Sequence, residues 1–85
     1  MELTIRNKLG LHARAAATLV QLTNRFESII EIEKEGKTVN GKSIMGIMML
    51  AAAKGNKIIV NANGSDSGEA LEAIKELVFN KFGEE

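Results

Sequence analysis

Residues 29–40 read Ile29-Ile30-Glu31-Ile32-Glu33-Lys34-Glu35-Gly36-Lys37-Thr38-Val39-Asn40, and this pattern is typical of a β-hairpin. Successive side chains of a strand point to opposite faces, so Ile30 and Ile32 are expected to face the protein interior. Ile29 and the glutamates at 31 and 33 then face solvent, where we interpret the carboxylates as solvated rather than paired for catalysis. Residues 35–37 are expected to turn and residues 38–40 to form the returning strand.

The chain on either side of this hairpin alternates between strand-like and helix-like periodicity. Strands are expected near residues 3–7 and 58–62, and helices from about residue 13, from about residue 44 to 51, and after the capping residues 63–67. The residues expected to face the interior in these elements are Leu3, Ile5, Asn7, Ala16, Leu19, Val20, Thr23, Phe26, Ile47, Leu50, Ala51, Ile58, Val60, Ala62, Leu71, Ile74, Leu77, Val78 and Phe82.

The resulting order of elements is β-α-β-β-α-β-α. Strands that alternate cleanly have one dry face and one wet face, which predicts an antiparallel or mixed sheet with helices on one side. This is an α+β fold, an open-faced two-layer β-sandwich. Eighty-five residues suffice for one small domain, residues 1–85, but not for a deep, water-excluding pocket. We therefore expect the protein to act at its surface, and we expect residues 83–85 to form a tail.

The composition argues against several classes of function. Lys plus Arg and Asp plus Glu both number 11, whereas nucleic-acid-binding proteins usually have a basic excess. The chain also has only three aromatic residues, too few for base stacking. The chain has no cysteine, so neither disulfides nor thiolate metal sites are expected. It shows neither a basic-then-apolar leader nor an apolar run near the roughly 20 residues of a bilayer span. We expect a soluble, cytoplasmic protein without membrane insertion, and a monomer.

His12, the only histidine, lies where the first helix is expected to begin, in Gly10-Leu11-His12-Ala13-Arg14. A helix N-terminus has unpaired N–H groups and a partial positive charge, which favour phosphate and disfavour a protonated ring. Arg14 adds a fork of donors suited to phosphate oxygens. One histidine without cysteine does not predict a metal site, and a hydrolase-type triad lacks an orienting acid nearby. The alternative is a surface or capping histidine without chemistry.

The segment Gly10–Arg14 resembles the active-site signature of the HPr family, the histidine-containing phosphocarriers of the bacterial phosphoenolpyruvate:sugar phosphotransferase system. The similarity continues in residues 36–40 and 42–48, and the length matches. The resemblance implies a four-stranded antiparallel sheet with three helices on one face. It also implies that His12 takes a phosphoryl group on Nδ1 from phospho-enzyme I and passes it to an enzyme IIA component or an equivalent regulatory acceptor.

Such a protein is a covalent relay without a cofactor rather than an enzyme, with Arg14 as the partner of the phosphate. Ala15 stands where the family normally has proline. Proline is tolerated in the first turn of a helix and alanine is a strong helix former, so we expect the helix start to be preserved.

The second expected helix, from residue 44, is apolar nearly all round, which is unusual for a short surface helix. At 100° per residue, Ile44, Met45 and Met48 share an outward-facing arc, and exposed methionines suit an adaptable binding surface. The alternative is a core helix with some apolar residues left over. The resemblance implies that this face docks enzyme I and enzyme IIA, with Ala17 and Gln21 at its rim.

Ser43 precedes that helix and is expected to be its N-cap. The resemblance implies a second role, because a dedicated kinase phosphorylates the corresponding serine in one branch of the family. A phosphate there would add about −2 charge beside the apolar face and weaken docking without unfolding the domain. HPr kinase/phosphorylase and a transcriptional regulator would then be further partners. Two alternatives remain open: a regulatory module, either a phospho-Ser43 co-regulator or a nitrogen-type branch, and a plain α+β adaptor.

Overall fold

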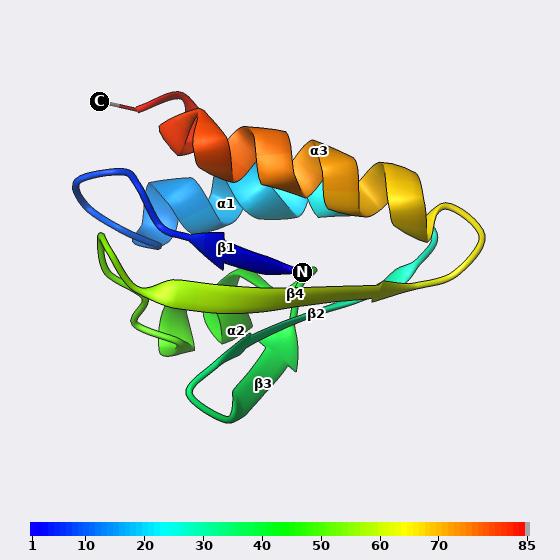
Figure 1. Cartoon of the computed structure of the whole chain (residues 1–85), viewed down its shortest axis with the longest axis horizontal. Helices are drawn as coiled ribbons and strands as arrows, with labels where there is room; N and C mark the ends of the chain where they lie inside the picture. Colours follow the sequence, from blue (N-terminus) through cyan, green and yellow to red (C-terminus); the bar gives the residue numbers. More distant parts are fainter. Residues whose placement is uncertain (85) are drawn as a thin grey trace.

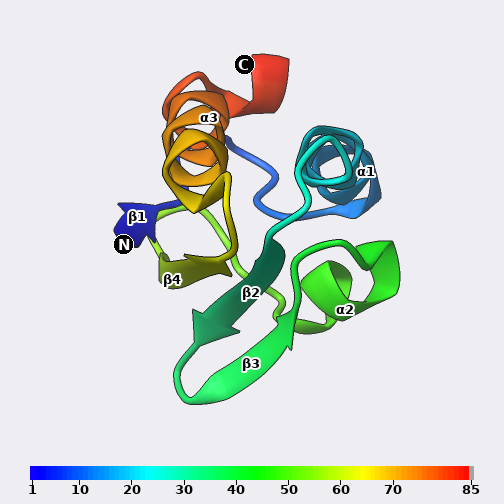
Figure 2. The same ribbon diagram turned by 90° about the vertical axis from the view of Figure 1, so that its right-hand side faces the viewer.

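A computed structural model describes residues 1–84 (Figure 1). The elements in chain order are β1 (Glu2–Thr4), α1 (Ala13–Thr23), β2 (Ile29–Lys34), β3 (Lys37–Asn40), α2 (Ile44–Met49), β4 (Lys57–Asn63), α3 (Ser67–Phe79) and the 3₁₀ turn η1 (Lys81–Gly83). The strands form one antiparallel sheet in the order β1-β4-β2-β3. Figure 2 shows the three α-helices on the same side of this sheet, so the expected α+β open-faced sandwich is confirmed.

The alternation of β2 and β4 produces the core layer of the sheet. Ile30 lies opposite Ala62 and Ile32 lies opposite Val60 in the central antiparallel pair, with the side chains of Ile30, Ile32 and Val60 fully buried. The helices cover this layer with apolar stripes that are also buried. The helical core residues are Ala15, Ala16, Leu19, Val20, Ile47, Ala70, Ile74 and Val78. Burial of each large side chain contributes about 1.5–3 kcal/mol, which makes this layer the main stabilising feature of the domain.

The turn between β2 and β3 is shorter than expected. Lys34 pairs with Lys37, so the loop consists of Glu35 and Gly36 alone. Both have positive φ, 52° and 85°, as a two-residue primed turn requires. Lys37 therefore belongs to β3 rather than to the turn.

The α2 helix ends earlier than its apolar sequence indicates, at Met49 rather than near residue 51. Ala51 takes a left-handed conformation (φ 51°) and is exposed, whereas Ala52 is buried. The prediction that Ala51 faces the core is therefore wrong, because the left-handed residue rotates the chain and turns its neighbour inward. The ammonium groups of Lys34 and Lys37 donate to carbonyl groups at this helix end, those of Leu50 (3.2 Å) and Met49 (3.1 Å).

Within residues 1–84, the longest α-helix is α3 with 13 residues, and no helix has the length and apolar character needed to cross a membrane.

Candidate functional site

The turn before α1 is held by the segment that follows α2. Gly10 has φ 68° and sits against Ala52, so that a Cβ built on Gly10 would lie 2.4 Å from the Ala52 carbonyl oxygen. The backbone N–H of Leu11 donates to that same oxygen at 2.9 Å, and the Leu11 side chain is buried. This anchoring fixes where the chain enters α1 and therefore where His12 stands.

His12 is the N-cap residue of α1, and the helix starts at Ala13 as expected. Its side chain makes no capping hydrogen bond, while its carbonyl accepts the N–H of Ala16 at 2.8 Å. Ala15 is buried in the first turn, and the helix start is preserved with alanine at this position, as expected. The imidazole is instead directed outward, half-buried, toward a partner from the other end of the chain.

That partner is Glu84, whose Oε2 lies 2.8 Å from His12 Nε2. The other carboxylate oxygen, Oε1, accepts a hydrogen bond from Asn7 Nδ2 at 3.0 Å. Within residues 1–84 no hydrogen bond is formed to His12 Nδ1. One ring nitrogen is therefore occupied by a carboxylate and the other is left available.

The environment of Glu84 favours its ionised form. Burial acts to raise the pKa of this carboxyl, but the hydrogen bonds from Asn7 and His12, together with the nearby charge of the Arg14 guanidinium, outweigh burial. The net effect lowers the pKa of Glu84 below its ordinary value, so the group is a carboxylate at neutral pH.

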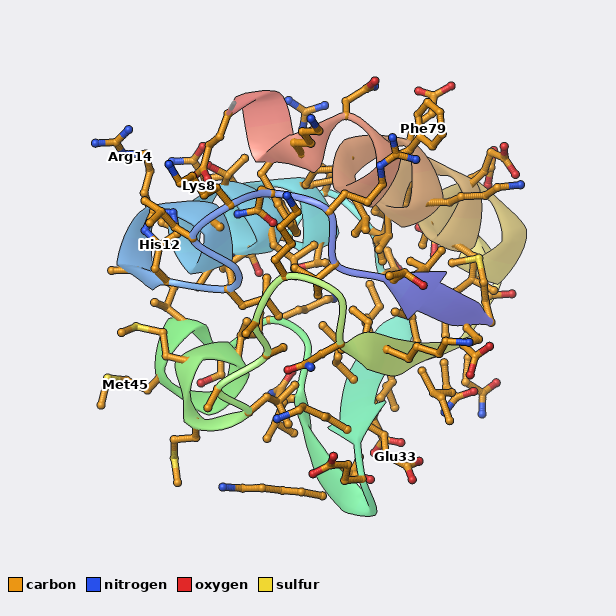
Figure 3. The ribbon with its side chains drawn as sticks, turned by 60° about the vertical axis from the view of Figure 1, so that its left-hand side comes forward. Lys8, His12, Arg14, Glu33, Met45 and Phe79 are labelled. Atoms are coloured by element: carbon orange, nitrogen blue, oxygen red, sulfur yellow. The ribbon has the colours of Figure 1, made fainter. Side chains whose placement is uncertain are left out.

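Arg14 lies one residue beyond Ala13 in the first turn of α1 and is exposed. Figure 3 shows Arg14, His12 and Lys8 gathered at one end of the molecule. Among residues 1–84 the guanidinium of Arg14 forms no ion pair, so it is available to an anion. A surface hollow at this end is lined by Lys8, Leu9, Arg14, Phe82, Gly83 and Glu84.

Sequence reasoning missed Glu84 and Asn7 as parts of this site. Residues 83–84 are not a free tail, and the expectation that no orienting acid lies near His12 is wrong; residue 85 lies outside the described residues. The partners are 72 residues apart in sequence, a separation that no local motif spans. The available signal was Phe82, an apolar residue beyond the last helix; its burial holds the chain close enough for Glu84, two residues later, to reach His12. Asn7, expected in the interior of a strand, is fully buried in the loop after β1.

The outward face of α2 carries the apolar residues that helical spacing predicts to be exposed. Ile44, Met45 and Met48 are all exposed, Met45 at 71%. On α1, Ala17 is half-buried and Gln21 exposed. We call Ile44, Met45 and Met48 the α2 patch. Figure 3 shows Met45 pointing to the same side of the molecule as His12.

Met49, which is 61% exposed, adds to the exposed apolar surface of α2. Sequence reasoning did not single it out. Ser43 is confirmed as the N-cap of α2, because its Oγ accepts the N–H of Gly46 at 3.0 Å. In the described part of the chain, no three His, Cys, Asp or Glu side chains gather as a metal site would require.

The fold and the position of this histidine define a small α+β protein with a half-buried imidazole at the start of its first helix. A sequence model of the family described as "PTS HPr component phosphorylation site" matches residues 1–80. The chain belongs to the HPr family of phosphotransferase-system phosphocarriers, as the resemblance of residues 10–14 predicts.

Individual members of the family are similar in sequence to this chain over most of its length. The chain is 50% identical over 84 residues to "Phosphocarrier protein HPr" of Xylella fastidiosa, covering 99% of this chain and 94% of the relative. It is also 50% identical over 74 residues to "HPr-like protein Crh" of Bacillus subtilis, covering 87% of each. The crystal structure of HPr-C-His from Thermoanaerobacter tengcongensis superposes with a TM-score of 0.96 at 49% identity, covering 100% of this chain and 96% of the other.

Proposed function

We propose that this protein accepts a phosphoryl group on Nδ1 of His12 from phospho-enzyme I and donates it to an enzyme IIA component of a sugar permease. One observation carries this proposal. Nε2 is hydrogen-bonded to Glu84 at 2.8 Å, so Nδ1 is the ring nitrogen left for an incoming group. Membership of the HPr family supplies the direction of the transfer.

The chemistry requires little more than positioning and charge. The Nδ1 lone pair attacks phosphorus, and the bond from phosphorus to the donor atom of enzyme I breaks with its electron pair leaving on that atom. The phosphoryl oxygens would then accept hydrogen bonds from the unpaired N–H groups in the first turn of α1 and from the guanidinium of Arg14. These are charge-assisted contacts without an enclosing cage, which suits a group that is held briefly and passed on.

The protein would act as a relay and not as a turnover enzyme, since its own histidine is phosphorylated in the first transfer and restored in the second. Its residues require neither a metal nor another cofactor for this step. Docking of enzyme I and enzyme IIA would use the α2 patch, with Ala17 and Gln21 of α1 at its edge. The exposed apolar area next to the reactive end of the molecule supports this assignment.

Phosphorylation of Ser43 would regulate the same surface. Its side chain is partly exposed at the start of α2, directly before Ile44 of the α2 patch. A phosphate adds about −2 charge at neutral pH, which disfavours apolar docking through desolvation and repulsion. HPr kinase/phosphorylase would be the modifying partner and a transcriptional regulator a reader of the modified form.

The central test is transfer of label from phosphoenolpyruvate by enzyme I. The expected product is an acid-labile, base-stable phosphoprotein that does not form with His12→Ala. Circular dichroism of that variant checks that it is folded. If the unmodified protein takes no label, or His12→Ala takes as much, the carrier function is wrong.

A second candidate, a regulatory module, is favoured by one observation. The similarity to the HPr-like protein Crh of B. subtilis is as high in identity as that to the phosphocarriers, over 74 residues. In that case phosphorylation of Ser43 would create binding to a transcriptional regulator, and label at His12 would be absent. The presence of His12 and an unpaired Nδ1 favours the carrier.

A further inference from the structure

The hydrogen bonds around Glu84 lead to a further inference, which rests on the proposed function. We propose that Glu84, supported by Asn7, is a positioning residue that holds His12 as its Nε2–H tautomer and so keeps Nδ1 nucleophilic. Glu84 does not contact the phosphoryl group in this scheme. It acts through the ring.

The orientation of the Glu84 carboxylate is fixed by two hydrogen bonds. Its two oxygens are used by different partners, Oε2 by His12 at 2.8 Å and Oε1 by Asn7 at 3.0 Å. The Glu84 side chain is 14% exposed and that of His12 28%, so the pair is only partly shared with water. Because each oxygen has its own partner, the carboxylate is restricted both in its rotation and in its distance from the His12 ring.

Asn7 holds the carboxylate from the other side through bonds that it donates. The Asn7 amide donates twice through Nδ2, to Glu84 and to the Gly10 carbonyl at 2.8 Å. Its Oδ1 is buried and has no partner within residues 1–84. An unpaired buried oxygen is costly, so the two donated bonds are what keep the amide in this orientation. Asn7 thereby links the Gly10 turn, which sets the backbone of His12, to the carboxylate that sets its ring.

The Glu84 carboxylate determines which nitrogen of the His12 ring carries the proton. An ionised carboxylate has only acceptors, so the nitrogen facing Glu84 must carry the hydrogen. The lowered pKa of Glu84 keeps it ionised at neutral pH. A neutral imidazole has one N–H, and once Nε2 carries it, Nδ1 must hold the lone pair. The tautomer needed for attack through Nδ1 is thus the one that the carboxylate selects.

The same contact assists transfer in both directions. When Nδ1 bonds to phosphorus, the Nε2 proton stays in place and positive charge develops on the ring, facing the Glu84 carboxylate. When the phosphoryl group leaves, the electron pair of the N–P bond returns to Nδ1 and the ring departs neutral, still protonated at Nε2. An acid that orients a histidine and stabilises its charged form acts this way in hydrolase triads.

The experiment compares Glu84→Gln, Glu84→Ala and the control Glu33→Gln. A glutamine at 84 has one oxygen and one NH₂ group. Asn7 donates to the oxygen, so the NH₂ faces Nε2 and forces it to accept, which moves the ring proton to Nδ1. An alanine at 84 neither donates to nor accepts from Nε2, so neither tautomer of the His12 ring is selected. Glu33 lies on β2, away from His12 in Figure 3, and its replacement removes the same charge.

Two measurements are made on each protein. In ¹⁵N spectra of the neutral, unphosphorylated ring, wild type and Glu33→Gln should show the Nε2–H tautomer, and Glu84→Gln a shift toward Nδ1–H. The kcat/KM for phosphorylation by enzyme I should fall about 10-fold in Glu84→Gln and less in Glu84→Ala. A merely structural role of Glu84 would make the alanine variant the worse of the two.

The outcomes separate this inference from the carrier function. A wild-type ring dominated by the Nδ1–H tautomer overturns the inference without any variant. The inference is also overturned if Glu84→Gln is phosphorylated with the same kcat/KM as Glu33→Gln, or if a folded Glu84→Gln protein keeps the wild-type tautomer. In either case, labelling of the wild-type protein still supports the carrier function. If wild type takes no label, the carrier function fails and the spectra still decide what Glu84 does to the ring.

Discussion

Gly10 and Ala52 approach so closely that a single methyl group at position 10 would lie 2.4 Å from the Ala52 carbonyl oxygen. This contact joins the loop that leads into His12 to the segment directly after α2, the helix that carries the α2 patch. Because the obstacle is backbone, it cannot be relieved by a change of side-chain rotamer. A glycine at position 10 therefore permits the close packing of these two segments.

Gly10→Ala should lower the free energy of unfolding by about 3 kcal/mol, the sum of a left-handed conformation and overpacking. Gly36→Ala is the matched control: Gly36 has φ 85°, but nothing lies within 4 Å of its added Cβ. Its cost should be about 1 kcal/mol. Urea denaturation measures both, and equal losses would contradict the close approach.

Acid should destabilise the protein partly through Asp66. A hydrogen bond from the Ser28 hydroxyl and one from the Glu27 N–H lower the pKa of Asp66 below its ordinary 3.8. The folded state then binds fewer protons than the unfolded state, so this contribution is present above about pH 4 and lost as pH falls through the folded pKa. Asp66→Ala should lower the urea midpoint at pH 7. The difference between the urea midpoints at pH 7 and pH 3 should therefore be smaller in Asp66→Ala than in wild type. Glu72→Gln, at an exposed position, is the control. If Asp66→Ala shows the same difference between the two midpoints as wild type, Asp66 is not a source of the acid sensitivity.

Docking on the α2 patch should depend on Met45. Met45→Ala should weaken binding to enzyme I about 10-fold, as expected for one central apolar contact of about 1.4 kcal/mol. Its unfolding free energy should stay within about 0.5 kcal/mol of wild type. Ile29→Ala is the control, because Ile29 is equally exposed (68%) on β2, outside the α2 patch. Titration calorimetry checks both, and greater weakening by Ile29→Ala would move the docking surface to the sheet.

Ser43 allows its capping and regulatory roles to be separated. Ser43→Ala removes the acceptor of the Gly46 N–H and should cost about 1 kcal/mol of stability. Ser43→Asp keeps an N-cap acceptor and should retain stability, yet it places a negative charge beside Ile44 and should weaken enzyme I binding. Thermal unfolding and titration on the two variants test this. Unchanged affinity of Ser43→Asp would argue against regulation by charge.

Much of the fold could be predicted because its signals are local. The alternation at Ile30 and Ile32 reports a strand with one buried face, and the pair Gly10 and His12 marks the start of α1. The end of α2 could not be predicted, since Ala51 takes a positive φ that its sequence does not indicate. Lysines from the β2–β3 hairpin satisfy carbonyls at that helix end, and their position depends on the folded sheet.

The candidate site divides in the same way. His12, Arg14 and the α2 patch follow from spacing along helices, where neighbours in sequence are neighbours in space. The pairing of His12 with Glu84 closes a loop of 72 residues. It depends on how α3 packs, on the left-handed turn at Lys81 and Phe82, and on burial of the Phe82 ring. Local sequence determined which ring could react; only tertiary packing decided which of its nitrogens faces a carboxylate, because that contact exists only once distant segments have been brought together around one core.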